Sequence, residues 1–215
     1  MTLFRVDSSI RTEGSVSREV ADTLEAAWTQ HNPGGQVVRR DLGVAPLPSD
    51  AWPAAVTGSH TPAEARTPEQ QKAVALATSL ADELEQAQAV LVAAPLYNFG
   101  VPAHLKSWMD LIITDPRFGP GTTPLEGKHV TLLVVRGGGY GPGTPREGWD
   151  HSTGYLMRIF RDAWGGDVTL VEAELTLADV NPAMAGLRDA AAVSRAKAHE
   201  QAAALGRTIA GLVAA

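Results

Sequence analysis

Apolar segments that look like strands alternate with segments of helical periodicity along the whole chain. The two most apolar runs, residues 89–94 and 130–135, are continuous and do not alternate in polarity. A strand of that kind is buried on both faces, which is typical of a parallel sheet covered by helices. Parallel neighbours must be joined by crossovers, which are usually helical, so the pattern predicts an α/β fold.

The pattern repeats five times, and residues 46–68, rich in Pro, Ser, Thr and Ala, are expected to form a functional or partner-facing loop. Strands are expected at Leu3–Val6, Val37–Asp41, Ala89–Ala94, Val130–Val135 and Val168–Leu175. Helices are expected at Val16–Gln30, Glu69–Gln86, Ala103–Asp110, Tyr155–Ala163 and Pro182–Ala215. The second strand is less hydrophobic and is placed near an edge. Residues 1–215 are therefore predicted to form one flavodoxin-like α/β domain, a doubly wound five-stranded parallel sheet in the order 2-1-3-4-5 with helices on both faces.

Composition excludes several classes of function. The net charge of −6 argues against general nucleic-acid binding, and no apolar run approaches the length of about 20 residues that a membrane span needs. The chain has no cysteine, which excludes disulfides, thiolate metal sites and a cysteine nucleophile and favours a reducing cytoplasm. The six histidines are scattered without ligand spacing, so no metal site is expected.

The loop after the first strand combines hydroxyls and glycine just before a helix. The hydroxyls of Ser9, Ser15 and Ser17 and the amides of Val16 and Ser17 could bind an anion there. The loop lacks both Gly-x-x-x-x-Gly-Lys and Gly-x-Gly-x-x-Gly, so a monophosphate fits better than a triphosphate or a Rossmann dinucleotide. The alternative is plain helix capping by Ser15 or Ser17.

The loop after the third strand, Pro95 to Pro102, carries two aromatics and an amide between stiffening prolines. Main-chain groups from Leu96 to Phe99 could bond the polar edge of a planar ring, and the side chains of Leu96 and Phe99 could pack against it. A flavin is the first ligand to consider. Tyr97 and Phe99 could instead be ordinary core or interface aromatics.

The loop after the fourth strand, Arg136 to Gly143, is rich in glycine, which allows close approach of the backbone to a ligand. Its donors could stabilise negative charge on the pyrimidine edge of a flavin. Arg136 is either part of this site or a solvated surface charge. Tyr140 and His151 are candidate proton donors to substrate, with a rim aromatic and a surface histidine as the alternatives.

These motifs resemble those of the FMN-dependent NADH-azoreductases, in the flavodoxin-like NAD(P)H:quinone oxidoreductase superfamily. The resemblance rests on Ser8-Ser9-Ile10 with Ser15-Val16-Ser17, on Pro95 to Phe99 with Pro102-Ala103 and Leu105-Lys106, and on Gly127-Lys128 before the strand leading to Arg136-Gly137-Gly138. It implies FMN bound tightly but not covalently, at Ser9, Ser15, Val16, Ser17, Pro95, Leu96, Tyr97, Asn98, Phe99, Val135, Arg136, Gly137 and Gly138. It also implies a homodimer with active sites at the interface. NADH or NADPH would reduce the flavin and leave, and a quinone or azo compound would then be reduced in the same pocket.

The chain departs from the family pattern at two places. Val135 replaces a small hydroxyl residue, and the stretch from Ile112 to Glu126 is shortened, without the aromatic segment that helps to roof the flavin in relatives; Phe118 is the candidate substitute. Two other functions remain open. One is a flavodoxin-like electron carrier without its own NAD(P)H reaction, and the other is a response-regulator-like domain, for which Asp7 alone is too few acidic residues.

Overall fold

The strands form one parallel sheet in the predicted order. In the computed structural model, which describes residues 1–212, five strands run β2-β1-β3-β4-β5, and each neighbouring pair is parallel. They are β1 (Thr2–Asp7), β2 (Gln36–Asp41), β3 (Ala89–Pro95), β4 (His129–Val135) and β5 (Asp167–Ala173). The less apolar second strand lies at an edge, and the predicted fold class is confirmed.

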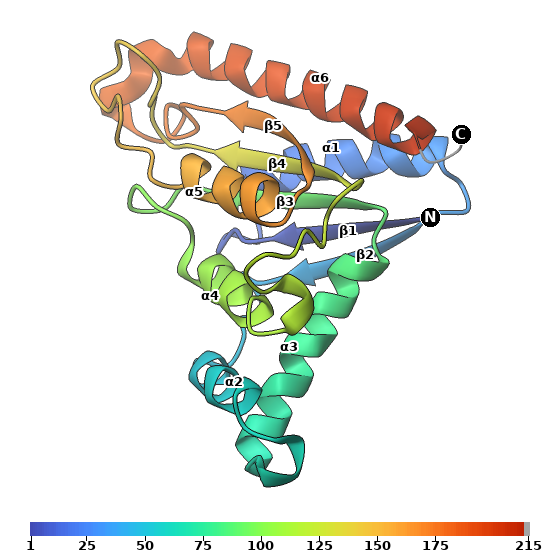
Figure 1. Ribbon diagram of the computed structural model, residues 1–215. Coiled ribbons are helices and arrows are strands. Elements are labelled where there is room, and N and C mark those ends of the chain that lie inside the picture. The colour runs from blue at the N-terminus through green and yellow to red at the C-terminus, as the bar shows by residue number, and fades with distance from the viewer. Residues whose placement is uncertain (213–215) are drawn as a thin grey trace.

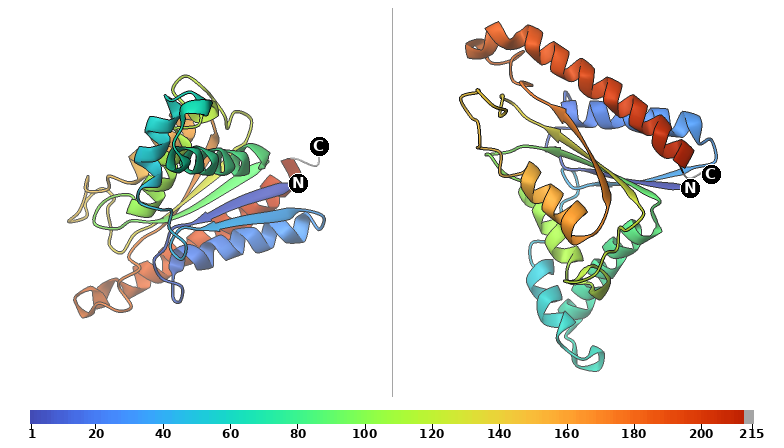
Figure 2. Two further views of the ribbon diagram at one scale, coloured as in Figure 1. Left: turned by 90° about the horizontal axis from the view of Figure 1, so that it is seen from below. Right: turned by 45° about the horizontal axis from the view of Figure 1, so that its top comes forward.

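Helices cover both faces of the sheet (Figure 1). On one face lie α1 (Val16–His31) and α6 (Arg188–Leu212), which continues from the 3-10 helix η4 (Pro182–Leu187). On the other lie α3 (Pro68–Gln86), α4 (Ala103–Ile112), α5 (Thr153–Met157), the π-helical turn η3 (Arg158–Ala163) and the short η2 (Pro116–Phe118). The two further views in Figure 2 also show helices on both sides of the sheet. Residues 213–215 of the predicted last helix lie outside the described residues.

The position of β3 in the middle of the sheet explains why its sequence is apolar throughout. Val90 and Val92 belong to the core beneath α3 and α4, where Trp108 is also buried. Leu91 and Ala93 belong to the core on the opposite face, beneath α1 and α6. All seven residues of β3 are buried, as expected for a strand with helices on both sides.

The segment 46–68 contains a helix that the sequence did not predict. α2 (Ala51–Ser59) and the 3-10 helix η1 (Ala63–Ala65) project from the sheet together with the start of α3 (Figures 1 and 2). The buried face of α2 consists of Ala51, Ala55 and Gly58, residues too small to give a hydrophobic period. Pro53 is tolerated because it lies in the first turn, where its missing N–H has no intrahelical partner.

The other differences from the predicted elements are small. β5 ends at Ala173 and not at Leu175, whose φ of +63° is incompatible with a strand. Within residues 1–212 no helix has both the length and the apolar character of a membrane crossing. In that same range no three His, Asp or Glu side chains gather in a way that could hold a metal ion.

Candidate active site

The loops after β1, β3 and β4 meet at the carboxyl ends of the strands, where open parallel sheets bind ligands. They enclose a cavity of about 270 Å³. Its lining residues are Ser9, Arg11, Gly14, Ser15, Val16, Ser17, Pro95, Leu96, Tyr97, Val135, Gly137, Thr176 and Leu177. Segments from both halves of the chain therefore build one site at the switch point between β1 and β3.

The start of α1 faces this cavity without a side-chain cap. Ser15 occupies the N-cap position, yet its hydroxyl makes no capping bond and lies 3.2 Å from the hydroxyl of Ser17. The first turn of a helix leaves N–H groups without intrahelical partners, and those of Val16 and Ser17 are beside the cavity. The alternative of plain capping by Ser15 or Ser17 is therefore not what the structure shows, and the turn has the donors that an anion requires.

Ser9 is tied to the wall formed by the second loop. Its hydroxyl accepts a bond from the N–H of Arg11 at 3.2 Å and lies 3.4 Å from the phenolic oxygen of Tyr97. That oxygen also accepts from the N–H of Ile10 at 3.2 Å. Tyr97 thus joins the loop after β1 to the loop after β3, and it is a wall residue of the cavity and not an ordinary core aromatic.

The second loop turns sharply after Tyr97. The main chains of Tyr97 and Gly100 exchange two hydrogen bonds, of 3.2 and 2.9 Å, across Asn98 and Phe99. Those two residues have φ values of +48° and +67°, a left-handed pair that is typical of a type I′ turn and is unfavourable for phenylalanine. Pro95, Leu96 and Tyr97 line the cavity, whereas Asn98 and Phe99 lie at the exposed tip beside it.

The turn also decides which main-chain donors are free. The N–H of Leu96 is bonded to the carbonyl of Val135 at 2.7 Å, and that of Tyr97 to Gly100. Of the main-chain groups from Leu96 to Phe99 that we expected to bond a ring, the N–H groups of Leu96 and Tyr97 are therefore engaged within the protein. In the part of the chain that the structure describes, the N–H groups of Asn98, Phe99 and Gly137 donate to no protein acceptor.

The third loop contributes Gly137 to the cavity, but the structure does not bring Arg136 or Gly138 into it. Arg136 follows the last residue of β4, and its side chain points to acidic partners outside the cavity that Val135 and Gly137 line. The guanidinium of Arg136 is buried, 7% exposed, and pairs with Asp150 at 2.7 Å, Glu172 at 2.6 Å and Glu174 at 3.2 Å. The alternative of a solvated surface charge is wrong.

Burial and charge act on this cluster in opposite directions. Burial opposes the charge of Arg136, but hydrogen bonding to Glu172 and the nearby carboxylate of Asp150 outweigh it and raise the pKa of the guanidinium above its ordinary value. Burial likewise opposes ionisation of Asp150, yet bonds from the Thr153 hydroxyl and from the N–H groups of Thr153 and Ser152, together with Arg136, lower the pKa of this carboxyl. The loop between Gly137 and Ser152 is held at its base by an ionised cluster.

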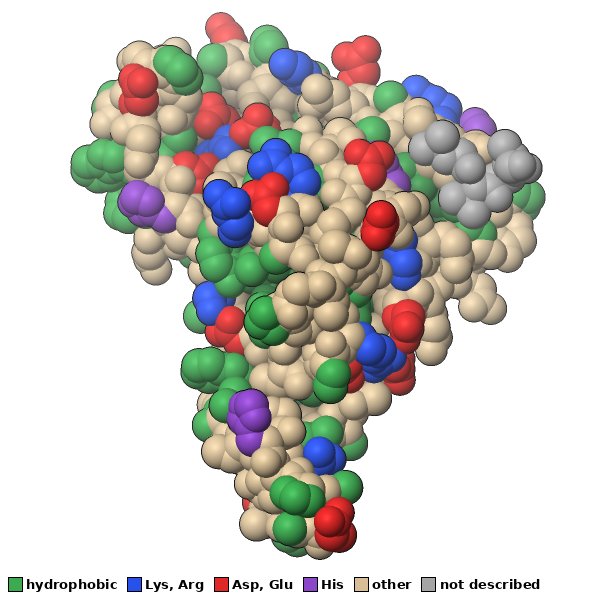
Figure 3. Space-filling view, in the orientation of Figure 1, with side chains coloured by type: hydrophobic (Ala, Val, Ile, Leu, Met, Phe, Trp, Pro, Cys, Tyr) green, Lys and Arg blue, Asp and Glu red, His purple; other side chains and the backbone are tan. Residues whose placement is uncertain are grey.

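The candidate proton donors lie on that same loop, outside the cavity. The Tyr140 hydroxyl accepts from Nη1 of Arg146 at 3.3 Å. His151 is exposed, and its main-chain N–H donates to the carbonyl of Phe99 at 2.9 Å. Trp149 meets Phe99 edge to face, with ring centroids 5.4 Å apart. Hydrophobic side chains lie along the left-hand edge of Figure 3, where the loops after β3 and β4 project in Figure 1.

The lining of the cavity differs from the sequence-based expectation in two further ways: an expected roof residue is absent from it, and four unexpected residues are present. Phe118 is 2% exposed in the core, edge-on to Trp164 at 5.3 Å, and so it does not roof the cavity. Arg11, Gly14, Thr176 and Leu177 line the cavity although sequence reasoning did not select them. Arg11 and Gly14 lie in the loop already recognised, but Thr176 and Leu177 belong to a fourth loop, whose amides bond to the carbonyls of Arg136 and Gly137.

Comparison with known proteins agrees with this arrangement. A protein family described as having a flavodoxin-like fold matches residues 1–198. A Streptomyces avermitilis protein named FMN-dependent NADH:quinone oxidoreductase is 42% identical over 216 residues, covering 100% of this chain and 99% of its own. A Parafrankia protein of the same name is 39% identical over 203 residues, covering 93% of this chain and 96% of its own.

Solved structures support the fold. The azoreductase from Bacillus anthracis strain Sterne superposes with a TM-score of 0.77 at 22% identity, covering 96% of this chain and 98% of that one. An FMN-dependent NADH-azoreductase from Bacillus anthracis strain Ames Ancestor, in complex with FMN, gives 0.74 at 20% identity, covering 95% and 99%. By its match over most of its length and its close relatives, the chain belongs to the flavodoxin-like family that includes the FMN-dependent NADH:quinone oxidoreductases.

Proposed function

We propose that this protein is an FMN-dependent NADH:quinone oxidoreductase that also reduces azo compounds. The observation that carries the proposal is the uncapped start of α1, which opens into a cavity walled by Pro95, Leu96 and Tyr97 on one side and Gly137 on another. The names of the relatives that are about 40% identical to this chain supply the activity.

The residues present suit the phosphate end of FMN. The hydroxyls of Ser9, Ser15 and Ser17 and the amides of Val16 and Ser17 would hold the phosphate, and their position at a helix N-terminus favours a negative charge. Arg11, which also lines the cavity, adds positive charge there. No side chain caps the start of α1, so none takes up the Val16 and Ser17 amides.

The second and third loops suit the ring of FMN. Pro95, Leu96, Tyr97 and Val135 would pack against it, and the N–H of Gly137 would donate to its polar edge. The cavity, at about 270 Å³, is slightly smaller than the usual range for ligand pockets, about 300–1,000 Å³. The ring would therefore extend toward the exposed tip that carries Asn98 and Phe99.

When bound, FMN supplies the acceptance of a hydride from NADH and its delivery to the second substrate. The chain's own residues bind and orient this group, and donors fixed beforehand favour the negative charge that reduction creates. No nucleophile or acid–base pair in the chain is required. Tyr140 and His151 belong to the border of the site and stay candidates for protonating the acceptor.

The proposal includes a homodimer whose active sites lie at the subunit interface, in a reducing cytoplasm. Phe99 is 38% exposed and Trp149 is 51% exposed beside the cavity, and Trp52, on the projecting α2, is 50% exposed. A second copy would cover these aromatic surfaces and complete the small cavity. The lack of cysteine fits the compartment.

The test is a spectroscopic titration. The purified protein should be yellow or take up FMN, NADH should bleach it anaerobically, and menadione or methyl red should restore the colour. A protein that takes up no FMN would refute the proposal. A yellow protein that neither NADH nor NADPH bleaches would favour the electron carrier, and a comparison of the two bleaching rates identifies the preferred reductant.

A further inference from the structure

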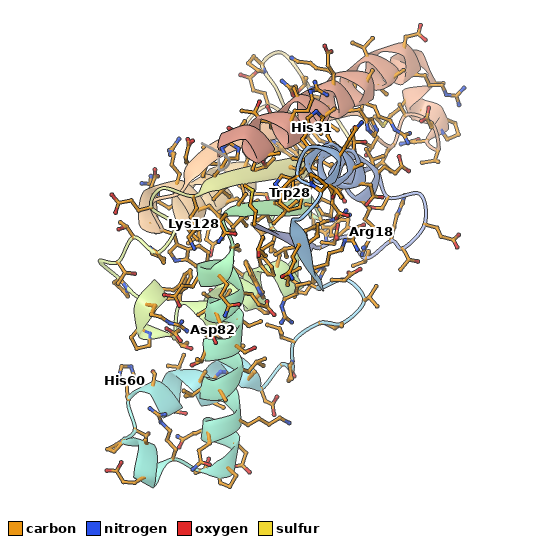
Figure 4. All side chains as sticks on the ribbon, turned by 90° about the vertical axis from the view of Figure 1, so that its right-hand side faces the viewer. Arg18, Trp28, His31, His60, Asp82 and Lys128 are labelled. Carbon is orange, nitrogen blue, oxygen red and sulfur yellow. The ribbon has the colours of Figure 1, made fainter. Side chains whose placement is uncertain are left out.

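Arg18 lies in the first turn of α1, outside the cavity, and reaches back to the loop that forms the cavity wall. Its guanidinium donates to the carbonyl of Ser9 at 2.9 Å and to the carbonyl of Arg11 at 2.8 Å. It also pairs with both oxygens of Asp41, at 2.6 and 2.8 Å. Figure 4 labels Arg18 beside the blue helix α1, on the opposite side of the view from Lys128. All these bonds use one rigid, planar group.

Asp41 connects Arg18 to a third segment of the chain, the turn after β2. It ends β2, and one of its oxygens also accepts from the N–H groups of Gly43 and Val44, each at 3.1 Å. The hydrogen bond from Arg18 lowers the pKa of the Asp41 carboxyl, and this effect outweighs burial, which would raise the pKa. Asp41 is therefore a stable anion. The turn after β2, the start of α1 and the loop after β1 are thereby joined through one ion pair.

Gly43 shows how closely these segments approach. A Cβ at this position would lie 1.9 Å from the carbonyl oxygen of Ser9, closer than any non-bonded contact allows. The Ser9 carbonyl is therefore confined between Gly43 and the guanidinium of Arg18. Since each peptide unit is planar and trans, turning the carbonyls of Ser9 and Arg11 toward Arg18 turns the next N–H groups the other way. That of Ile10 points to Tyr97, a wall residue of the cavity.

We propose that Arg18 is a positioning residue that holds the loop from Ser9 to Ser17 in the shape that binds the phosphate of the flavin. It does not line the cavity, and it acts through the carbonyls it bonds. The inference rests on the proposed function, which places the phosphate in this loop. Losing Arg18 lowers affinity for the phosphate of the ligand and leaves affinity for the ring unchanged.

A comparison of FMN with riboflavin isolates the phosphate. The full chain, freed of flavin, is titrated with each ligand while quenching of flavin fluorescence is followed. We expect the wild type to prefer FMN by well over tenfold, because charge-assisted bonds to the phosphate are lost with riboflavin. In Arg18→Gln we expect FMN affinity to fall about 10- to 100-fold, by analogy with the loss of outer-shell partners at metal sites. Riboflavin affinity should change less than about threefold, so that the preference largely disappears.

Two further variants separate geometry from charge. Arg18→Lys keeps the positive charge, but one ammonium cannot span Asp41 and both carbonyls, so it should behave like Arg18→Gln. Arg40→Gln is the matched control. Arg40 makes a similar two-point pair with Glu83, with side chains 23% and 22% exposed, and within residues 1–212 it bonds to no loop carbonyl. It should leave both affinities unchanged.

Each outcome decides something different. If the wild type binds FMN and riboflavin equally, the proposed phosphate site fails. If the wild type prefers FMN and Arg18→Gln keeps that preference, or Arg18→Lys restores it, the positioning role of Arg18 fails. Thermal unfolding of the flavin-free variants shows whether they fold. If Arg18→Gln does not fold, Asp41→Asn is tested instead. Asparagine keeps an oxygen that accepts from Gly43 and weakens only the pairing with Arg18. A full FMN preference in that variant would overturn the inference.

Discussion

Arg18 and Arg136 flank the same cavity and hold their loops by different means. Arg18 pairs with one carboxylate and bonds two main-chain carbonyls, whereas Arg136 pairs with three carboxylates and donates to the Thr153 hydroxyl at 2.8 Å. A guanidinium bonded to carbonyls fixes the path of the backbone. A guanidinium among carboxylates balances buried charge. The first arrangement should therefore govern ligand affinity, and the second should govern stability.

Replacing Arg136 should have the largest effect on folding. Arg136→Met leaves Asp150, which is 14% exposed, and the half-exposed Glu172 without their cation. Removing one partner of a buried pair costs about 3–5 kcal/mol, and the exposure of Glu172 places this case near 3 kcal/mol. Chemical denaturation measures it, and a double variant with Asp150→Asn shows whether the two residues are coupled. A loss below about 1 kcal/mol, or a change in the preference for FMN over riboflavin, would break the comparison.

Gly43→Ala tests the other side of the comparison. Its new Cβ would overlap the Ser9 carbonyl, so the loop must move, at a cost of about 1–3 kcal/mol in the free energy of unfolding. FMN affinity should fall along with it. Gly34→Ala is the control, because no described residue has an atom within 4 Å of its added Cβ, and it should change stability by less than about 0.5 kcal/mol. Equal behaviour of the two variants would contradict the close approach at Gly43.

Asp150→Asn should show a smaller effect that depends on pH. A carboxyl whose folded-state pKa is lowered stabilises the fold above its unfolded pKa and loses this contribution as the pH falls through the folded value. The variant should be about 1–2 kcal/mol less stable at pH 7. The difference from wild type should shrink below about pH 4, the ordinary pKa of aspartate. Denaturant titrations at several pH values check this, and a difference that grows in acid would contradict it.

The smallest effect is expected at Arg146. Its guanidinium lies 5.8 Å from the Phe99 ring and 5.9 Å from the Tyr140 ring, and within residues 1–212 no carboxylate pairs with it. An exposed cation–π contact contributes about 0.5–1 kcal/mol, so Arg146→Gln should lower stability by no more than that. If Arg146→Gln lowered the free energy of unfolding as much as Arg136→Met, pairing with carboxylates would not explain the larger effect expected at Arg136.

The sheet could be predicted from the sequence because its central strands are buried on both faces. The continuous apolar runs of β3 and β4 identified them, and the polar residues of β2 placed it at the edge. Helix α2 could not be predicted in this way, since it is buried through Ala51, Ala55 and Gly58. The π-helical turn η3 depends on tertiary packing and has no sequence period of its own.

The site was predictable where main chain and strand ends define it. Ser9, Ser15 and Ser17 follow from their place around the start of a helix, and Pro95 to Tyr97 from their place at the end of a strand. Arg136 was misplaced because the direction of a side chain beyond the end of a strand depends on its partners, here Asp150 and Glu172. Arg18 was missed because two of its partners are main-chain carbonyls, which no residue type marks in a sequence, and the third, Asp41, is 23 residues away.

The bare start of α1 also has a consequence for the life of the protein in a cell. A phosphate bound there would complete the first helical turn with oxygens that the chain itself does not supply. A ligand at a hundredfold excess over its Kd adds about 2.7 kcal/mol to the free energy of unfolding. Because proteases remove the unfolded form, the abundance of this protein should follow the supply of FMN. A shortage of riboflavin, from which FMN is made, would shorten the half-life of the protein.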